Sequence, residues 1–222
     1  MFLTVFSFHP VKHVATGEGG AITTNDEELY RKLKLFRTHG ITRDRDEMVN
    51  PTDARWYNEQ VTLGYNYRIT DIQCALGVSQ IKKLDAFVER RRELVKRYNE
   101  AFKGLEGVVC PKQAAGCNNS WHLYVVQIPN RKEAYDRLRE AGIFANVHYI
   151  PVYKHPYYQE HGYDKICCPN AEKLYEHMLS LPLYPGLTDE EQDYVIESCV
   201  DISEKSVFKL GYIPESAISL KV

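Results

Sequence analysis

The sequence lacks the features that mark several large classes of protein. Its 222 residues carry a formal net charge of only −2, so no positive excess points to a nucleic-acid or membrane-surface partner. No apolar run approaches the roughly 18 residues that a membrane-spanning helix needs. The N-terminus has neither the basic start nor the long apolar stretch of a signal peptide. We therefore expect a soluble, cytoplasmic protein that binds neither nucleic acid nor membrane.

Disulfide and metal-binding cysteine patterns are missing as well. The six cysteines form no Cys-x-x-Cys pair, and Cys167 and Cys168 are adjacent, which is a poor geometry for a shared metal. We expect no structural metal, and we expect six reduced thiols, most of them buried, as in a cytosolic protein.

What the sequence does contain is an alternation of strand-like and helix-like segments, which is typical of the α/β class. Phe2–Phe8 and Ala21–Thr24 are rich in β-branched and aromatic residues and predict two strands. Asn25, with Glu28 three residues on, predicts the start of a helix, and Gly40 stands where that helix should end. Residues 41–63 show no period and predict a long loop.

A long apolar stripe follows the next predicted helix start, a capping box of Thr70 and Gln73. It exceeds the roughly 25 residues of ordinary globular helices. A coiled coil is one alternative, but Gly77 and the drift of the stripe favour two joined or bent helices that link two domains. We place the domain boundary near Asp85. The stripe runs through Ile72, Leu76, Ile81, Leu84, Val88, Val95 and Phe102.

The C-terminal part predicts a small α/β domain, and the tail after Ile202 shows no clear period. Its expected elements are strands at Ser120–Ile128 and Ala145–Tyr149, and helices from Asn130 (capped with Glu133) to Leu138, from Asn170 to Leu179, and from Thr188 (capped with Glu191) to Cys199.

One lysine stands between the first two predicted strands, which look buried. Burial of a lysine is costly unless its pKa falls or its amine is covalently engaged, so Lys12 suits a Schiff base to a carbonyl cofactor. Pyridoxal phosphate is the commonest such cofactor, and Ser7 could supply a hydroxyl to its phosphate. The alternative is a plain hairpin turn, because glycines after a strand are common there and no phosphate-binding loop motif is present.

Several stretches resemble a known family. SFHPVK at residues 7–12, with GEGGA at 17–21 and TN at 24–25, resembles the active-site segment of the DegT/DnrJ/EryC1/StrS sugar aminotransferases. GYNYR at 64–68, followed by DIQ at 71–73 and ALG at 75–77, resembles the family's next signature. VHY at 147–149, PVY at 151–153 and SLP at 180–182 resemble its C-terminal domain.

The resemblance implies a fold and a division into domains. The fold would be the C-terminal portion of a fold-type-I, aspartate aminotransferase-like transferase of the α/β class. Residues 1–85 would be the C-terminal part of the large cofactor-binding domain, residues 86–202 the small α/β domain, and residues 203–222 a tail that matches the family poorly.

The resemblance also implies a role for each matching residue. Lys12 would form the Schiff base with pyridoxal phosphate and later move a proton, and Ser7 would bind the cofactor phosphate. Asn66 would reach the cofactor phosphate of a neighbouring subunit, which requires a homodimer. Arg68 is a candidate for the diphosphate of a UDP-sugar substrate. Within the family, the motifs resemble those of enzymes of pseudaminic acid biosynthesis, which implies transfer of an amino group from glutamate to the C4 ketone of a UDP-4-keto-6-deoxy-N-acetylhexosamine.

Other residues have two readings. His148 and Tyr153 match family positions that suggest substrate binding, but His148 could be a satisfied core histidine and Tyr153 could pack against the neighbouring prolines. Arg37 could orient the long loop or simply face solvent at the end of its helix.

The chain starts just before Lys12, whereas similar proteins have a substantial upstream segment. In those proteins that segment supplies the residue that pairs with the pyridine nitrogen of the cofactor and the aromatic residue that stacks on its ring. We therefore expect a truncated chain that is poorly soluble or needs partners. The alternative function is a catalytically inactive remnant that at most dimerises. The family's sugar 3-dehydratases carry histidine in place of the lysine, so Lys12 disfavours that chemistry.

Overall fold

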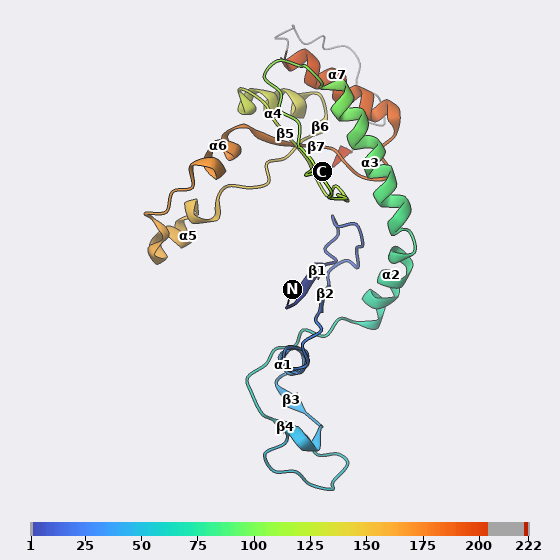
Figure 1. Ribbon diagram of the computed structural model, residues 1–222, viewed down its shortest axis with the longest axis vertical. Helices are drawn as coiled ribbons and strands as arrows, with labels where there is room; N and C mark the ends of the chain where they lie inside the picture. The colour runs from blue at the N-terminus through green and yellow to red at the C-terminus, as the bar shows by residue number, and fades with distance from the viewer. Residues whose placement is uncertain (1, 204–219, 222) are drawn as a thin grey trace. The chain divides into compact units, whose positions relative to one another are not determined.

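The computed structural model describes residues 2–203 and 220–221. The chain divides into two compact units, Met1–Leu84 and Asp85–Val222, which we call unit 1 and unit 2 (Figure 1). The division lies at the start of a long helix, beside Asp85, where the sequence suggested a boundary. Each unit is described by itself.

Unit 1 begins with a two-stranded antiparallel hairpin. Strand β1 (Thr4–Ser7) pairs with β2 (Gly20–Thr23), with Ser7 opposite Gly20. Helix α1 (Glu27–Arg37) follows, and its N-cap is Asp26, whose carboxylate accepts a hydrogen bond from the Leu29 N–H at 3.0 Å. The expected cap at Asn25 is therefore wrong by one residue, because the aspartate makes the charge-assisted bond that satisfies the first turn.

The expected long loop contains regular structure. Strands β3 (Ile41–Thr42) and β4 (Glu59–Gln60) pair antiparallel, and the short 3₁₀ helix η1 (Arg45–Glu47) lies between them. The buried Glu59 carboxylate organises this segment, since it accepts hydrogen bonds from the Val49 N–H (2.6 Å), the Asn50 N–H (2.8 Å) and the Tyr57 hydroxyl (2.9 Å). Strands of two residues are too short to show the alternation of apolar and polar residues from which a strand is predicted.

Two helices follow as expected. Helix α2 (Asp71–Ile81) starts at the Thr70–Gln73 capping box, which is confirmed, and helix α3 (Leu84–Ala101) starts after Lys82–Lys83. The prediction of two joined helices is confirmed, but the break lies at these lysines rather than at Gly77. Gly77 instead allows close packing, because a Cβ there would lie 3.2 Å from Thr16 Cγ2.

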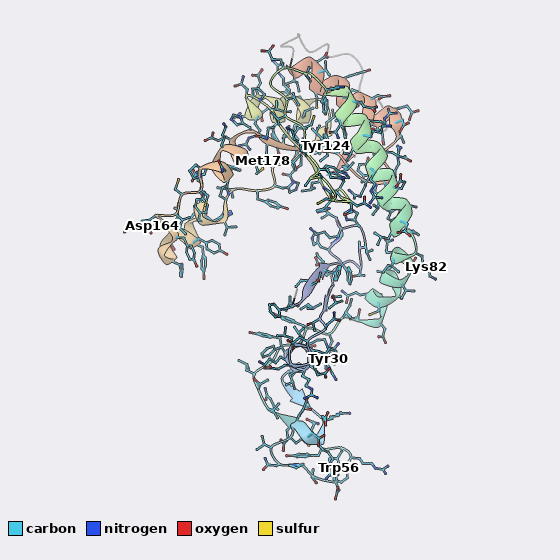
Figure 2. The ribbon with its side chains drawn as sticks, viewed as in Figure 1. Tyr30, Trp56, Lys82, Tyr124, Asp164 and Met178 are labelled. Atoms are coloured by element: carbon cyan, nitrogen blue, oxygen red, sulfur yellow. The ribbon has the colours of Figure 1, made fainter. Side chains whose placement is uncertain are left out.

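The described residues of unit 2 contain two small two-stranded sheets, on which helices pack. Strand β5 (Tyr124–Gln127) pairs antiparallel with β7 (Met178–Leu181), and the short β6 (Ile143–Phe144) pairs in parallel with β8 (Leu220–Lys221). Helices α4 (Arg131–Glu140) and α7 (Asp189–Ser203) pack against each other. Tyr124 and Met178, at opposite ends of the paired strands, are labelled in Figure 2.

Between β6 and β7 the chain leaves the body of unit 2 as an arm (Figure 1). It comprises the 3₁₀ helix η2 (Val152–Lys154), the short α5 (Pro156–Tyr158), the π-helical η3 (Gln159–Tyr163) and α6 (Pro169–His177). Asp164, near the end of the arm, is labelled in Figure 2.

Several expected bounds in unit 2 need correction. The strand expected at Ala145–Tyr149 is replaced by β6 and one isolated bridge between Asn146 and Ser180. Helix α6 ends at His177, and the following residues form β7. Asn130 is the N-cap of α4, but it adopts the left-handed conformation (φ 54°) and its side chain makes no capping bond. The capping box of Thr188 and Glu191 is confirmed (3.1 and 2.9 Å).

The hydrophobic core lies in unit 2. Tyr98 on α3 stacks on Tyr124 of β5, with ring centroids 4.7 Å apart, and on Phe102 at 5.7 Å. The buried Arg91 guanidinium ties α3 to the segments that flank β5 and β7, since one nitrogen donates to the carbonyls of Trp121 (3.2 Å), His122 (3.0 Å) and Leu183 (2.8 Å). Burial lowers the pKa of Arg91.

The exposure of the cysteines differs from the expectation drawn from composition. The cysteines of the sequence are free, but only Cys199 is buried, while Cys74, Cys117, Cys167 and Cys168 are exposed, so the expectation of mostly buried thiols is wrong. Burial raises the pKa of Cys199 to about 12. Among the described residues, no helix has both the length and the apolar character to cross a membrane.

Candidate functional site

Lys12 lies in the loop that joins β1 to β2, and backbone hydrogen bonds connect the two ends of this loop. The Phe8 N–H donates to the Gly19 carbonyl, the Thr16 N–H to the Phe8 carbonyl and the Lys12 N–H to the His9 carbonyl, each at 2.9 Å. Lys12 is half-buried. These hydrogen bonds therefore hold the backbone around Lys12 in one conformation.

Two glycines of GEGG, Gly19 and Gly20, lie where a side chain would collide with neighbouring atoms. A Cβ on Gly20 would lie 2.7 Å from the Phe6 carbonyl oxygen, and one on Gly19 would lie 2.5 Å from Thr16 Oγ1. The Glu18 carbonyl accepts hydrogen bonds from the Thr16 hydroxyl and from Gln73 Nε2, both at 2.7 Å. The N-terminal turn of α2 is thus hydrogen-bonded to the loop that carries Lys12.

The strands around Lys12 are not buried, which corrects the expectation from the sequence. Val5 and Phe6 of β1 are 67% and 47% exposed, and Ile22 of β2 is 45% exposed. The two strands form a sheet of their own that no further strand joins among the described residues. Apolar composition predicts a strand, but only packing partners bury it.

Ser7 is the last residue of β1, directly before the lysine loop. Its Oγ accepts a long hydrogen bond from the His9 N–H at 3.4 Å. Ser7 and Lys12 therefore belong to one hairpin, as the sequence suggested.

Asn66 and Arg68 lie in the extended segment between β4 and α2. The backbone of Asn66 bridges to Thr38, and the flanking N–H groups of Tyr65 and Tyr67 donate to the carbonyls of Phe36 (2.7 Å) and Arg37 (3.0 Å). The rings of Tyr65 and Tyr67 stack 4.9 Å apart. Because side chains alternate along an extended segment, Asn66 and Arg68 share the other face.

Gly40 and Gly64 allow this segment to cross the end of α1. A Cβ on Gly64 would lie 2.1 Å from the Gly40 nitrogen, and one on Gly40, whose φ is +69°, would lie 1.9 Å from the Thr62 carbonyl oxygen. The backbones therefore meet where no side chain fits, and this contact fixes the position of Asn66 and Arg68.

Arg68 lines a cavity of about 480 Å³ within unit 1, which we call the basic cleft. Arg31, Lys34 and Arg37 come from one face of α1, and Arg43 comes from the link between β3 and η1. Sequence reasoning missed the cleft, although Arg31, Lys34 and Arg37 repeat every three residues, which places them along one side of a helix. Its polar lining consists of Arg31, Lys34, Arg37, Thr38, His39, Thr42, Arg43, Asp44, Glu47, Asn58 and Arg68.

The remaining two predicted site residues belong to unit 2. His148 Nδ1 lies 2.8 Å from the hydroxyl of the fully buried Ser180, and its Nε2 lies 3.3 Å from Asn146 Nδ2. His148 is thus hydrogen-bonded to the sheet, as a structural histidine would be. Its substrate role stays a prediction.

Tyr153 contacts Glu172 on α6, to which its hydroxyl donates at 2.9 Å, and it accepts from the Cys168 N–H at 3.2 Å. Burial and Glu172 raise the pKa of Tyr153 against the opposing effect of the Cys168 N–H, so it stays a protonated donor at neutral pH. Lys154 also binds Glu172, at 2.6 Å. Tyr153 is therefore held by polar contacts, and its substrate role also stays a prediction.

Comparisons with known proteins agree with these motifs. A UDP-4-amino-4,6-dideoxy-N-acetyl-beta-L-altrosamine transaminase from Campylobacter jejuni is 36% identical over 215 residues, covering 95% of this chain and 54% of the relative. The structure of Helicobacter pylori PseC, an aminotransferase involved in the biosynthesis of pseudoaminic acid, matches with a TM-score of 0.83 and 32% identity, covering 92% of this chain and 54% of PseC.

A third match is the PLP-form of Spr1654, a sugar aminotransferase of Streptococcus pneumoniae, with a TM-score of 0.80 and 32% identity over 93% of this chain and 53% of the neighbour. The chain spans about half the length of the curated relatives it matches. The expected fold is confirmed as the mixed α/β fold of part of a fold-type-I transferase. Since residues 2–200 match its family profile, the chain belongs to the DegT/DnrJ/EryC1/StrS aminotransferase family.

Proposed function

We propose that this chain carries the lysine half of a pyridoxal-phosphate-dependent sugar aminotransferase. The enzyme would move an amino group from glutamate to the C4 ketone of a UDP-linked 4-keto-6-deoxy-N-acetylhexosamine, in the cytoplasm. The substrate is suggested by the names of the Campylobacter and Helicobacter relatives. The observation that carries the proposal is the hairpin in which Ser7 ends β1 and Lys12 follows in a loop held by backbone hydrogen bonds.

The donor set in this hairpin fits pyridoxal phosphate. An amine that can attack the cofactor's aldehyde needs a fixed backbone and partial shelter, and Lys12 has both. The Ser7 oxygen accepts from the His9 N–H, and among the described residues nothing accepts its hydroxyl proton. That proton could be donated to a phosphate oxygen.

The cofactor, when bound, supplies an electron sink for the bonding electrons of a carbon–hydrogen bond. The protein's part is proton transfer. The amine of Lys12 would take the proton from the carbon of the amino donor and return a proton to C4 of the sugar, as one group acting first as base and then as acid.

The remaining residues would position the reactants. We propose that residues 1–85 are part of the large cofactor-binding domain and residues 86–202 the small domain. Asn66 would donate to the cofactor phosphate of a second copy in a homodimer, and Arg68 would bind the substrate diphosphate with its planar fork of donors. His148 and Tyr153 would contact the sugar substrate from unit 2.

Covalent labelling tests the role of Lys12. The chain is incubated with pyridoxal phosphate and reduced with borohydride, and its peptides are mapped by mass spectrometry. We expect the label on the peptide that contains Lys12 and its loss in Lys12→Ala. The matched control is Lys32→Ala, because the Lys32 amine is exposed and paired with Glu28 at 2.6 Å. Equal labelling of Lys12→Ala and Lys32→Ala would refute the assignment.

A second candidate function is that of an inactive dimerisation remnant. The exposed strands β1 and β2 favour it, since Val5, Phe6 and Ile22 offer apolar surface around the lysine rather than a closed site. The same experiment separates the two proposals. Absence of label throughout the chain would support the remnant, whereas selective label on Lys12 would support the enzyme.

A further inference from the structure

We propose that Thr16 and Gln73 are positioning residues for Lys12, because their side chains hold the loop of this lysine against helix α2 through one shared acceptor. We call the arrangement the Glu18 clamp, and it consists of the Thr16 hydroxyl, the Glu18 carbonyl and the Gln73 side-chain amide. The inference rests on the proposed function for the role of Lys12. It gives Thr16 and Gln73 no part in the chemistry itself, and it can be tested without substrate.

Thr16 is buried in a unit that has no apolar core. It is 2% exposed, the lowest value among the polar residues of unit 1 that the structure describes. A Cβ on Gly77 of α2 would lie 3.2 Å from Thr16 Cγ2, and a Cβ on Gly19 would lie 2.5 Å from Thr16 Oγ1. Two glycines therefore leave the space that this one side chain fills.

Two side-chain donors meet at the Glu18 carbonyl. The Thr16 hydroxyl donates to it at 2.7 Å, and so does Gln73 Nε2, also at 2.7 Å, from 55 residues further along the chain. A carbonyl oxygen has two lone pairs, so its capacity is used in full. Gln73 belongs to the first turn of α2, which its capping box with Thr70 fixes. The clamp therefore joins the lysine loop to the start of a helix.

Backbone hydrogen bonds connect the clamp to Lys12. The Thr16 N–H donates to the Phe8 carbonyl, and the Phe8 N–H donates to the Gly19 carbonyl, each at 2.9 Å. These two bonds close the loop that contains Lys12, whose own N–H donates to the His9 carbonyl at 2.9 Å. A backbone that is already fixed lowers the ordering cost when the lysine amine engages a ligand.

A simpler explanation is that each side chain has only a local duty. Gln73 caps α2, since its Oε1 accepts from the Thr70 N–H at 3.0 Å. That cap uses the oxygen of the amide, and a glutamate would serve it equally well. The amide nitrogen of Gln73 bonds the Glu18 carbonyl instead, a contact that the cap does not require. The convergence of Thr16 and Gln73 on one carbonyl favours a joint role in holding the loop.

Two donor variants each remove one donor and keep the other contacts of that side chain. Thr16→Val keeps the methyl group beside Gly77 but lacks the hydroxyl, and Gln73→Glu keeps the oxygen that caps α2 but lacks the amide nitrogen. Thr16→Ser is the conservative rescue, because it retains the hydroxyl. The matched control is Glu18→Gln, which changes an exposed side chain 3.8 Å from His9 Nε2 and leaves the Glu18 carbonyl in place.

Amide hydrogen exchange measures the clamp by itself. We expect exchange at the Phe8, Lys12 and Thr16 amides to accelerate about fivefold in both donor variants, because each variant loses one hydrogen bond. The rescue and the control should stay within about twofold of the unaltered chain. The Tyr65 N–H, which donates to the Phe36 carbonyl at 2.7 Å, should exchange at the same rate in all four. Acceleration there as well would mean general destabilisation of unit 1 and would overturn the positioning role.

Borohydride trapping of pyridoxal phosphate measures the consequence for the lysine amine. We expect the pyridoxal phosphate concentration that labels half of Lys12 to rise about fivefold in both donor variants. In Thr16→Ser it should return to within about twofold of the unaltered chain. Label on the exposed Lys32 is the internal reference and should not change. Faster exchange in the loop with unchanged labelling of Lys12 would overturn the proposal.

Failure of the proposed function would give a different result. If the unaltered chain takes no label on Lys12, the lysine assignment fails, and the clamp then stands or falls on exchange at the loop amides alone. If the loop amides exchange equally in Thr16→Val, Gln73→Glu and the unaltered chain, the clamp is overturned whatever the labelling of Lys12 shows.

Discussion

The two units of this chain are stabilised in different ways. Among the described residues, every buried apolar side chain belongs to unit 2, from Leu94 on α3 to Cys199 on α7. In unit 1 the buried side chains are polar, namely Thr16, Thr42 and Glu59, and each is hydrogen-bonded. Unit 2 has a hydrophobic core, whereas unit 1 keeps its shape through hydrogen bonds and close backbone contacts.

The comparison shows that the residues assigned to chemistry lie largely outside the core. Lys12, Asn66 and Arg68 are all carried by loops of unit 1, which are positioned by backbone hydrogen bonds and by glycines. Binding and catalytic residues are commonly carried by loops that a rigid scaffold positions, because loop side chains are not needed to pack the core. The two units should therefore respond to different substitutions. Unit 2 should be sensitive to the loss of buried apolar side chains, and unit 1 to changes that disturb its hydrogen bonds and close backbone contacts.

The largest expected effect is on the core of unit 2. Leu94→Ala removes a side chain that is 0% exposed, and we expect it to lower the free energy of unfolding by about 3 kcal/mol. The matched substitution Leu76→Ala lies on α2 of unit 1, where the leucine is 48% exposed, and should change it by less than about 0.5 kcal/mol. Trp121 fluorescence in urea, with Trp56→Phe as background, gives the measurement.

Equal effects of the two leucines would break the comparison. Such a result would mean that Leu76 is buried in solution, for example by a second chain, and that unit 1 has an apolar interface. Concentration dependence of the Leu76→Ala effect would then identify it.

A smaller, local effect is expected from glycine substitution in unit 1. Gly64→Ala would bring a Cβ within 2.1 Å of the Gly40 nitrogen, so the chain must separate there. The bonds from the His39 N–H to the Tyr65 carbonyl (2.8 Å) and from the Tyr65 N–H to the Phe36 carbonyl (2.7 Å) should weaken. We expect amide exchange at His39 and Tyr65 to accelerate about tenfold or more.

Gly17→Ala is the control for this prediction, because a Cβ on Gly17 meets nothing within 4 Å. Its cost comes from the positive φ of +81° and should stay within its own loop. If Gly64→Ala leaves exchange at His39 and Tyr65 unchanged, close backbone contact does not hold unit 1 together.

The sequence predicted the elements that have local signals. The capping boxes at Thr70 and Thr188 each need only a threonine and an acidic or amide residue three positions later, and both are formed. The family resemblance likewise rested on contiguous motifs, and it is confirmed. Lys12 and Ser7 fall in one hairpin because they are five residues apart along the chain.

Features that depend on distant contacts could not be predicted. The hairpin of β3 and β4 is held by the Glu59 carboxylate and the Val49 and Asn50 N–H groups about ten residues away. The basic cleft needs Arg37, Arg43 and Arg68 to meet from three segments. Whether the apolar strands β1 and β2 are buried depends on partners, which composition does not reveal.

The smallest expected effect is the pH response of the loop in unit 1. Burial acts to raise the pKa of Glu59, but hydrogen bonds from the Val49 N–H, the Tyr57 hydroxyl and Asn50 outweigh it and lower the pKa below 4.5. Because the folded pKa lies below the unfolded one, the stabilisation is complete above pH 4.5 and is lost as the pH falls through the folded value. Acidification should therefore open the loop, while the core of unit 2 stays packed.

Amide proton shifts of Val49 and Asn50 during an acid titration measure this response. We expect both to titrate together with a midpoint below pH 4.5, and Glu59→Gln to abolish the titration. The control Glu27→Gln removes an exposed carboxylate of α1 and should leave the curves unchanged. A midpoint at or above 4.5 would mean that burial outweighs the three donors. At Glu59, desolvation would then have a larger effect than hydrogen bonding. The contrast between a unit 1 stabilised by hydrogen bonds and a unit 2 stabilised by a packed core would not hold at this buried carboxylate.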